Sequence, residues 1–262
     1  MYFKNLIYGL IIGIGFIIPG VSGGVLATIL GVYETILDKI SNLFKNFKNN
    51  TLYLLPICIG IITSIFLFSK LILYFLNNKS NFISYVFIGL ILGCLPYLIK
   101  EIKIKTNKKI SPLYFILSFS FGIILFIIEK NNISNISEPT MFLMLIAGIL
   151  YSAGKLIPGI SGAALLMLLG IYEYLLEILA NPFSITIKTL ILFIPFTISF
   201  IISSIFIIKL MNYLLNNHFR YTYSAIIGFI ISSILFIYPG NFTILSIIIT
   251  SCSFTISYFL SK

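Results

Sequence analysis

Six uninterrupted apolar runs constrain this chain more than any other feature of its sequence. They cover residues 52–76, 82–99, 112–128, 190–208, 223–238 and 242–260. A helix of about 20 apolar residues crosses the hydrocarbon core of a bilayer, so each run can span it, the shorter ones only just. Only 9% of the residues are charged, whereas a soluble domain carries about a quarter. The sequence therefore predicts an all-α polytopic membrane protein.

The net charge of +10 does not indicate a nucleic-acid-binding protein. The basic residues are few, scattered and outnumbered by aliphatic residues, and no basic amphipathic helix is present. Cys58, Cys94 and Cys252 all lie in apolar runs and the chain has a single histidine, so we expect no disulfide framework, no metal site and no cofactor. Lysines beside the spans are explained by the positive-inside rule.

A segment of 29 residues occurs twice, 139 residues apart. Residues 6–34 read LIYGLIIGIGFIIPGVSGGVLATILGVYE, and residues 145–173 read LIAGILYSAGKLIPGISGAALLMLLGIYE, with 14 of 29 positions identical. The same offset aligns Pro56 with Pro195 and Gly89 with Gly228. Aligned Pro, Gly, Ser, Tyr and Glu are not expected by chance among Ile/Leu-rich segments. We therefore divide the chain into a first repeat, residues 1–130, and a second, residues 131–262.

Each repeat begins with a segment that is too long for one span and short for two, residues 6–37 and 145–176. Pro-Gly-x-Ser-Gly interrupts each of them midway. A re-entrant hairpin fits, with one helix running to mid-membrane and a second returning, because broken backbone is tolerated there when protein or a cavity surrounds it. The first segment lacks an Ala-x-Ala cleavage site, so we keep it in the mature fold rather than assign it as a signal peptide.

The distribution of basic residues favours this topology. With two hairpins, 12 of the 17 basic residues fall on one side, which we take as cytoplasmic together with both termini. The run Lys100–Lys109 falls on this side, and we expect Gly31 and Gly170 to serve helix packing. A hairpin and three spans make an odd number of crossings, so the second repeat is inverted. Inverted repeats with broken helices are typical of secondary transporters in the cytoplasmic membrane.

The two hairpin tips form the predicted binding site, in which each serine starts the returning helix as an N-cap. Unpaired N–H groups and the positive helix ends would then face an anion such as a phosphate. The alternative is that the glycines only allow the hairpins to pack. The tip residues of this site are Pro19, Gly20, Ser22, Gly23, Gly24, Pro158, Gly159, Ser161 and Gly162.

Lys155 precedes the second tip by three residues in an otherwise apolar segment. A lysine inside a membrane segment is a functional candidate, here as the counter-charge for the anion, with snorkelling to an interface as the alternative. Two Tyr-Glu pairs follow the tips, Tyr33-Glu34 and Tyr172-Glu173, roughly 18 Å along each returning helix. The glutamates are candidates for proton coupling or headgroup guidance, or for simple pairing with a lysine.

The motif IPGVSGGVLATILGVYE and its second copy resemble the bacterial and archaeal PopT-like family of polyprenyl-phosphate (undecaprenyl-phosphate) transporters. The resemblance spans essentially the whole chain, with Ala163 at the position of Gly24 and Val25 where the family has a small polar residue. It implies a flippase that returns the lipid carrier's phosphate headgroup to the cytoplasmic leaflet for cell-envelope synthesis, with H⁺ or Na⁺ as a possible coupling ion. The oligomeric state does not follow from it.

Three classes of function stay open on the residues alone. The first is the lipid-phosphate flippase and the second is a secondary transporter of a small soluble anion. The third, a membrane enzyme or assembly factor, is disfavoured because no Ser-His-Asp set and no phosphatase-like cluster is present. An apolar opening to the bilayer would favour the lipid, and a sealed polar cavity would favour the solute.

Overall fold

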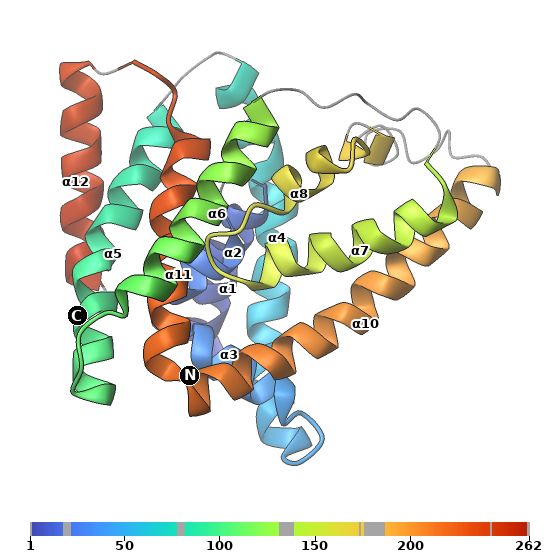
Figure 1. Cartoon of the computed structure of the whole chain (residues 1–262), viewed down its shortest axis with the longest axis horizontal. Coiled ribbons are helices and arrows are strands. Elements are labelled where there is room, and N and C mark those ends of the chain that lie inside the picture. The colour runs from blue at the N-terminus through green and yellow to red at the C-terminus, as the bar shows by residue number, and fades with distance from the viewer. Residues whose placement is uncertain are drawn as a thin grey trace.

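The computed structural model describes residues 2–17, 22–77, 82–130, 139–172, 174–175, 187–241 and 243–260. The described residues fold into helices (Figure 1). The bounds of these helices are α1 Tyr2–Ile17, α2 Gly23–Ile29, α3 Tyr33–Ser41, α4 Phe47–Asn77, α5 Phe82–Thr106, α6 Pro112–Lys130, α7 Met141–Leu156, α8 Gly162–Leu168, α10 Ile187–Asn217, α11 Phe219–Ile237 and α12 Ile244–Leu260.

The expectation of an all-helical, multi-pass membrane protein is confirmed. Among the described residues, α4, α5, α10 and α11 are long and apolar enough to cross a membrane, while α1, α6, α7 and α12 are shorter apolar helices. Large apolar side chains stay exposed along α10, such as Phe206 at 66% and Ile202 at 63%. Exposed apolar surface on this scale marks a face made for lipid or for another protein.

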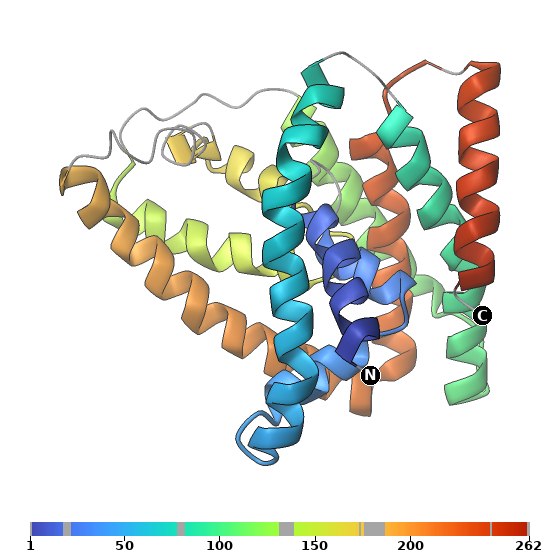
Figure 2. The same cartoon turned by 180° about the vertical axis from the view of Figure 1, so that it is seen from behind.

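The helices pack in pairs that recur at matching positions of the two sequence repeats. A Cβ at Gly9 of α1 would meet the Ile57 carbonyl of α4, and one at Gly148 of α7 would meet the Phe196 carbonyl of α10. Both members of the first pair lie 139 residues before those of the second. Because glycine has no side chain, the backbones of the paired helices can approach closely, as small residues allow in membrane helices. In Figures 1 and 2, α7 and α10 lie side by side and are inclined to the group that contains α5, α6, α11 and α12.

The buried core lies where α5 and α11 meet α2 and α3. Leu98 and Ile102 of α5 and Ile227 and Ile230 of α11 are completely buried, and they join Val25, Leu26 and Leu37 in one cluster. This core holds α2 and α3 in place beside the second repeat.

Helix α5 extends beyond its apolar run. The run ends at residue 99, whereas α5 continues to Thr106, so Lys100, Lys103 and Lys105 are helical. Ile, Lys and Glu are adequate helix formers, and Glu101 pairs with Lys105 one turn later at 3.3 Å. The helix is followed by Asn107 with a φ of +52°.

Candidate functional site

The first tip is described from Ser22 onward, and Pro19 and Gly20 lie outside the described residues. Ser22 is the N-cap of α2, as predicted. Its φ and ψ are −97° and 135°, and its hydroxyl accepts a hydrogen bond from the Gly24 N–H at 3.3 Å. Ser22 and Gly24 are both buried, so this cap lies inside the protein and not at its surface.

The second tip is a tight turn pressed against α11. Pro158, Gly159 and Ser161 are buried, and α8 begins at Gly162, directly after the serine. Gly159 has a φ of +86°, and a Cβ there would overlap the backbone of Phe229 and Ile230. Both the left-handed conformation and the close approach require glycine at this position.

The two tips contact each other. A Cβ at Gly24 would lie 3.4 Å from Pro158 Cα and 3.5 Å from the Leu156 carbonyl oxygen. That same oxygen accepts a hydrogen bond of 2.8 Å from the buried Tyr33 hydroxyl. Leu156 is the last residue of α7, where carbonyl groups lack helical partners. Tyr33 therefore caps α7 from the other repeat and fixes the distance between the tips.

Lys155 lies next to this contact as a partly buried cation. Its Nζ is 5.4 Å from the ring centroid of Phe16 and 5.2 Å from that of Tyr151. Within the described residues, no carboxylate oxygen comes within 4.0 Å of Nζ. The Cβ position of Gly162 is 3.6 Å from Lys155 Cε, so the lysine stem runs beside the start of α8. Aromatic faces compensate a desolvated ammonium only partly, which leaves a positive site ready for an anion.

Glycines at the tips also serve packing. A Cβ at Gly23 would lie 2.5 Å from the Phe16 ring, and one at Gly154 would overlap the backbone of Gly162. The helices that start at the tips, α2 and α8, each contain only seven residues. Such a helix is about 10 Å long, so its negative end lies close to the tip and offsets much of the dipole. The positive charge near the tips therefore rests mainly on Lys155.

The chain turns at Gly31, between α2 and α3. Gly31 has a φ of +68°, and nothing lies within 4 Å of a Cβ placed there. Gly170 has a φ of +70°. Our expectation that these two glycines serve packing is wrong for Gly31, which makes a turn in open space, and Gly170 likewise needs the left-handed conformation.

This turn directs Glu34 toward α5. Its carboxylate accepts a 2.7 Å ion-pair hydrogen bond from Lys105 Nζ. The two side chains line a polar cavity of about 160 Å³ together with Tyr33, Tyr97 and Tyr223. The lysine-paired alternative is therefore what the geometry supports for Glu34.

The second Tyr-Glu pair is only partly described. Tyr172 packs, partly buried, in a separate apolar cluster with Met144, and Glu173 lies outside the described residues.

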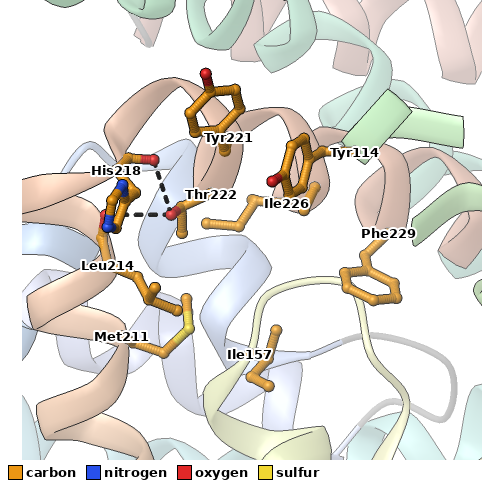
Figure 3. Close-up of a pocket in the computed structure, with 10 residues that line it drawn as sticks. Tyr114, Ile157, Met211, Leu214, His218, Tyr221, Thr222, Ile226 and Phe229 are labelled. Atoms are coloured by element: carbon orange, nitrogen blue, oxygen red, sulfur yellow. Dashed lines mark hydrogen bonds between the residues drawn. The ribbon is translucent and has the colours of Figure 1, made fainter. Parts of the chain in front are cut away.

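An apolar cavity of about 550 Å³ adjoins the second tip, and no local sequence pattern predicts it. Figure 3 shows Ile157 of the tip at one end and Tyr114 and Tyr221 at the other. Tyr114 and Tyr221 are 42% and 39% exposed, so the cavity reaches the surface between α6, α10 and α11. The residues that line it are Tyr114, Ile157, Met211, Leu214, His218, Tyr221, Thr222, Ala225, Ile226 and Phe229.

Within the part of the chain that the structure describes, no group of three or more His, Cys, Asp or Glu residues is placed to hold a metal ion. The three cysteines are free thiols, with Cys94 buried and the other two exposed.

Comparisons with known proteins identify the family of the chain. The chain matches the family model described as undecaprenyl phosphate translocase-like over residues 12–254. A polyprenyl-phosphate transporter of Staphylococcus aureus is 29% identical over 90% of this chain and 86% of its own length. A polyprenyl-phosphate transporter of Vibrio cholerae is 32% identical over 65% of this chain and 58% of its own length. No solved structure matches the chain. The chain belongs to the undecaprenyl phosphate translocase-like family, which is a family of transporters and not of enzymes.

Proposed function

We propose that this protein is a flippase that carries polyprenyl phosphate across the cytoplasmic membrane and returns the lipid carrier to the inner leaflet. The observation that carries the proposal is the position of Lys155. This lysine, without a carboxylate partner among the described residues, lies beside the contact between the tips, and the apolar cavity begins two residues further on, at Ile157. A phosphate at Lys155 and an isoprenoid chain in that cavity match the two parts of one ligand.

The phosphate site of the proposal consists of Lys155, the tip serines Ser22 and Ser161, and the tip backbone. A phosphate monoester carries about −1.5 to −2 charges at neutral pH, and transferring it into the membrane is costly without fixed donors. Lys155 supplies a full positive charge and Ser161 lies buried at the start of α8. The tip glycines allow a phosphate to approach the backbone closely.

Two inverted repeats, residues 1–130 and 131–262, form the proposed architecture, each with a re-entrant hairpin and three spans. The recurrence of helix pairs supports it, since α1 packs on α4 as α7 packs on α10. Two more helix pairs are equivalent in the two repeats, and each joins one repeat to the other. Gly89 of α5 approaches α12 at Thr250 and Ser253, while Gly228 of α11 approaches α6 at Phe115 and Ser118. Both termini lie in the lower half of Figure 1, the side that we propose is cytoplasmic.

The soluble-anion alternative receives less support. It predicts a sealed polar cavity of substrate size at the tips. The polar cavity near Tyr33 measures about 160 Å³, and the Glu34–Lys105 ion pair lines it. The larger cavity at the tips is apolar and reaches the surface, which suits a lipid.

Reconstitution into liposomes tests the proposal. Short-chain polyprenyl phosphate would be placed in one leaflet, and a membrane-impermeant reagent would report the headgroup that remains exposed. We expect the purified protein to accelerate loss of the accessible headgroup, and polyprenyl alcohol not to compete. Equal acceleration by protein that carries Lys155→Ala, or movement of inorganic phosphate without movement of the lipid, would contradict the proposal.

A further inference from the structure

A second, basic recess lies beyond the outer end of the apolar cavity. It measures about 300 Å³ and is formed by the end of α5, the segment that follows it, and the junction of α10 with α11. Lys105, Lys108 and Arg220 line it with His218 and two asparagines, and no lining residue is acidic. A concave surface lined by cations and amide groups is suited to an anion.

The charges in this recess are not equally available. Lys105 Nζ is already paired with Glu34 at 2.7 Å and Glu101 at 3.3 Å. Arg220 donates its Nε–H to the Lys109 carbonyl oxygen at 2.8 Å, which fixes the guanidinium in place. Its guanidinium Cζ lies 5.7 Å from the ring centroid of Tyr221, and its remaining N–H groups make no hydrogen bond to the described residues. Lys108 has no hydrogen bond or ion pair to the described residues either. A guanidinium held this way presents a planar donor edge to a phosphate.

The recess and the apolar cavity share two lining residues, His218 and Tyr221. The apolar cavity continues from them to Ile157 at the second tip (Figure 3). A ligand whose phosphate lies at Lys108 and Arg220 can therefore place its chain in the same cavity that serves a ligand bound at Lys155. The two positively charged sites flank one apolar space.

We propose that the basic recess is a second headgroup site, at which a prenyl phosphate binds through Lys108 and Arg220 on the cytoplasmic side. The inference rests on the proposed function, because it takes the transported lipid as the occupant. The shared apolar cavity distinguishes this lipid from a free phosphate, which would gain nothing from it. The phosphate would pass from Lys155 to the recess while the chain stays in apolar surroundings.

Photocrosslinking of the full chain in nanodiscs tests the inference. The probe is a farnesyl phosphate with a diazirine on its first isoprene unit, and labelled peptides are mapped by mass spectrometry. We expect labelling of two regions, the α7–α8 turn and the α10–α11 junction. Lys108→Gln should weaken labelling at the junction about tenfold and leave the α7–α8 turn labelled. Lys103→Gln serves as the matched control, since Lys103 lies on the same exposed end of α5 and does not line the recess.

A second variant and competition by unlabelled compounds test whether the recess binds a prenyl phosphate. Arg220→Lys keeps the charge, and we expect it to retain part of the labelling. Labelling of the α7–α8 turn alone would overturn the recess site and leave the proposed function standing, whereas no competable labelling anywhere would count against the proposed function itself. Farnesol should not compete. Displacement by inorganic phosphate or phosphatidylglycerol at the concentration at which unlabelled farnesyl phosphate competes would overturn the assignment to a prenyl phosphate.

Discussion

Lys155 lies over the ring of Phe16, the residue that occupies its own position in the first repeat, with Nζ 5.4 Å from the ring centroid. The two repeats thus place a cation and an aromatic face at equivalent points and bring them into contact. The proposed phosphate site is therefore asymmetric, with two tips but only one lysine.

Replacement of Lys155 should impair transport more than replacement of a tip serine. Lys155→Ala removes the charge, and we expect the initial rate of headgroup translocation to fall at least about tenfold. Lys155→Arg should retain part of the rate because the charge persists. Ser22→Ala loses a cap worth about 1 kcal/mol of stability and keeps the backbone N–H groups, so its rate should fall less. Normal transport by well-folded Lys155→Ala protein would mean that the lysine only anchors α7.

Two glycines with positive φ should respond differently to alanine. Gly159→Ala combines a φ of +86° with overlap of the Phe229–Ile230 backbone, and we expect the protein to be strongly destabilised. Gly31→Ala meets only the conformational cost, about 1–2 kcal/mol, because nothing lies within 4 Å of its Cβ. Thermal unfolding in detergent should rank them in this order, with Gly31→Asn closest to the parent. Equal melting temperatures would contradict the packing of the second tip on α11.

Loss of the Tyr33 hydroxyl should loosen the contact between the tips. Tyr33→Phe leaves the Leu156 carbonyl without its 2.8 Å donor, in a place where Tyr33 is only 5% exposed. We expect about 1–2 kcal/mol of destabilisation. Tyr213→Phe is the control, since that side chain is 58% exposed. Hydrogen exchange of residues 153–160 should rise in Tyr33→Phe and stay unchanged in the control. Equal protection in both variants would rule out the capping role.

Sequence reasoning succeeded where the signal is local. In each motif a proline and a serine lie among glycines, and a new helix begins directly after the serine, α2 at Gly23 and α8 at Gly162. Ser22 caps the first of these helices. It failed where tertiary contacts decide. The apolar cavity combines Ile157, Tyr114 and Met211 from three distant segments, and no local pattern marks such a meeting. A glycine in the sequence can serve either close packing or a turn. The left-handed conformation of Gly31 is therefore evident only from the backbone of the structure.

The ion pair between Glu34 and Lys105 should contribute little stability and should not be essential for transport. Its side chains are 33% and 39% exposed, and an exposed pair is worth about 0–1 kcal/mol. A double-mutant cycle with Glu34→Gln and Lys105→Gln should give a coupling free energy in that range. We expect Glu34→Gln to keep its transport rate within about twofold. A folded Glu34→Gln protein that has lost transport and its dependence on external pH would instead identify Glu34 as a coupling carboxylate.

Cysteine labelling should establish which side of the membrane each connection faces. The native thiols would first be removed by Cys58→Ser, Cys94→Ala and Cys252→Ser, since two of them are exposed. In the proposed topology, a cysteine introduced within 132–137 lies outside the cell and reacts with an impermeant maleimide on intact cells. Asn46→Cys, in the connection between α3 and α4, should react only after the membrane is permeabilised, because lysine-rich connections stay in the cytoplasm. Reaction of both positions from the same side would require an even number of crossings between residues 46 and 132, and would contradict the three spans that we propose for α4, α5 and α6.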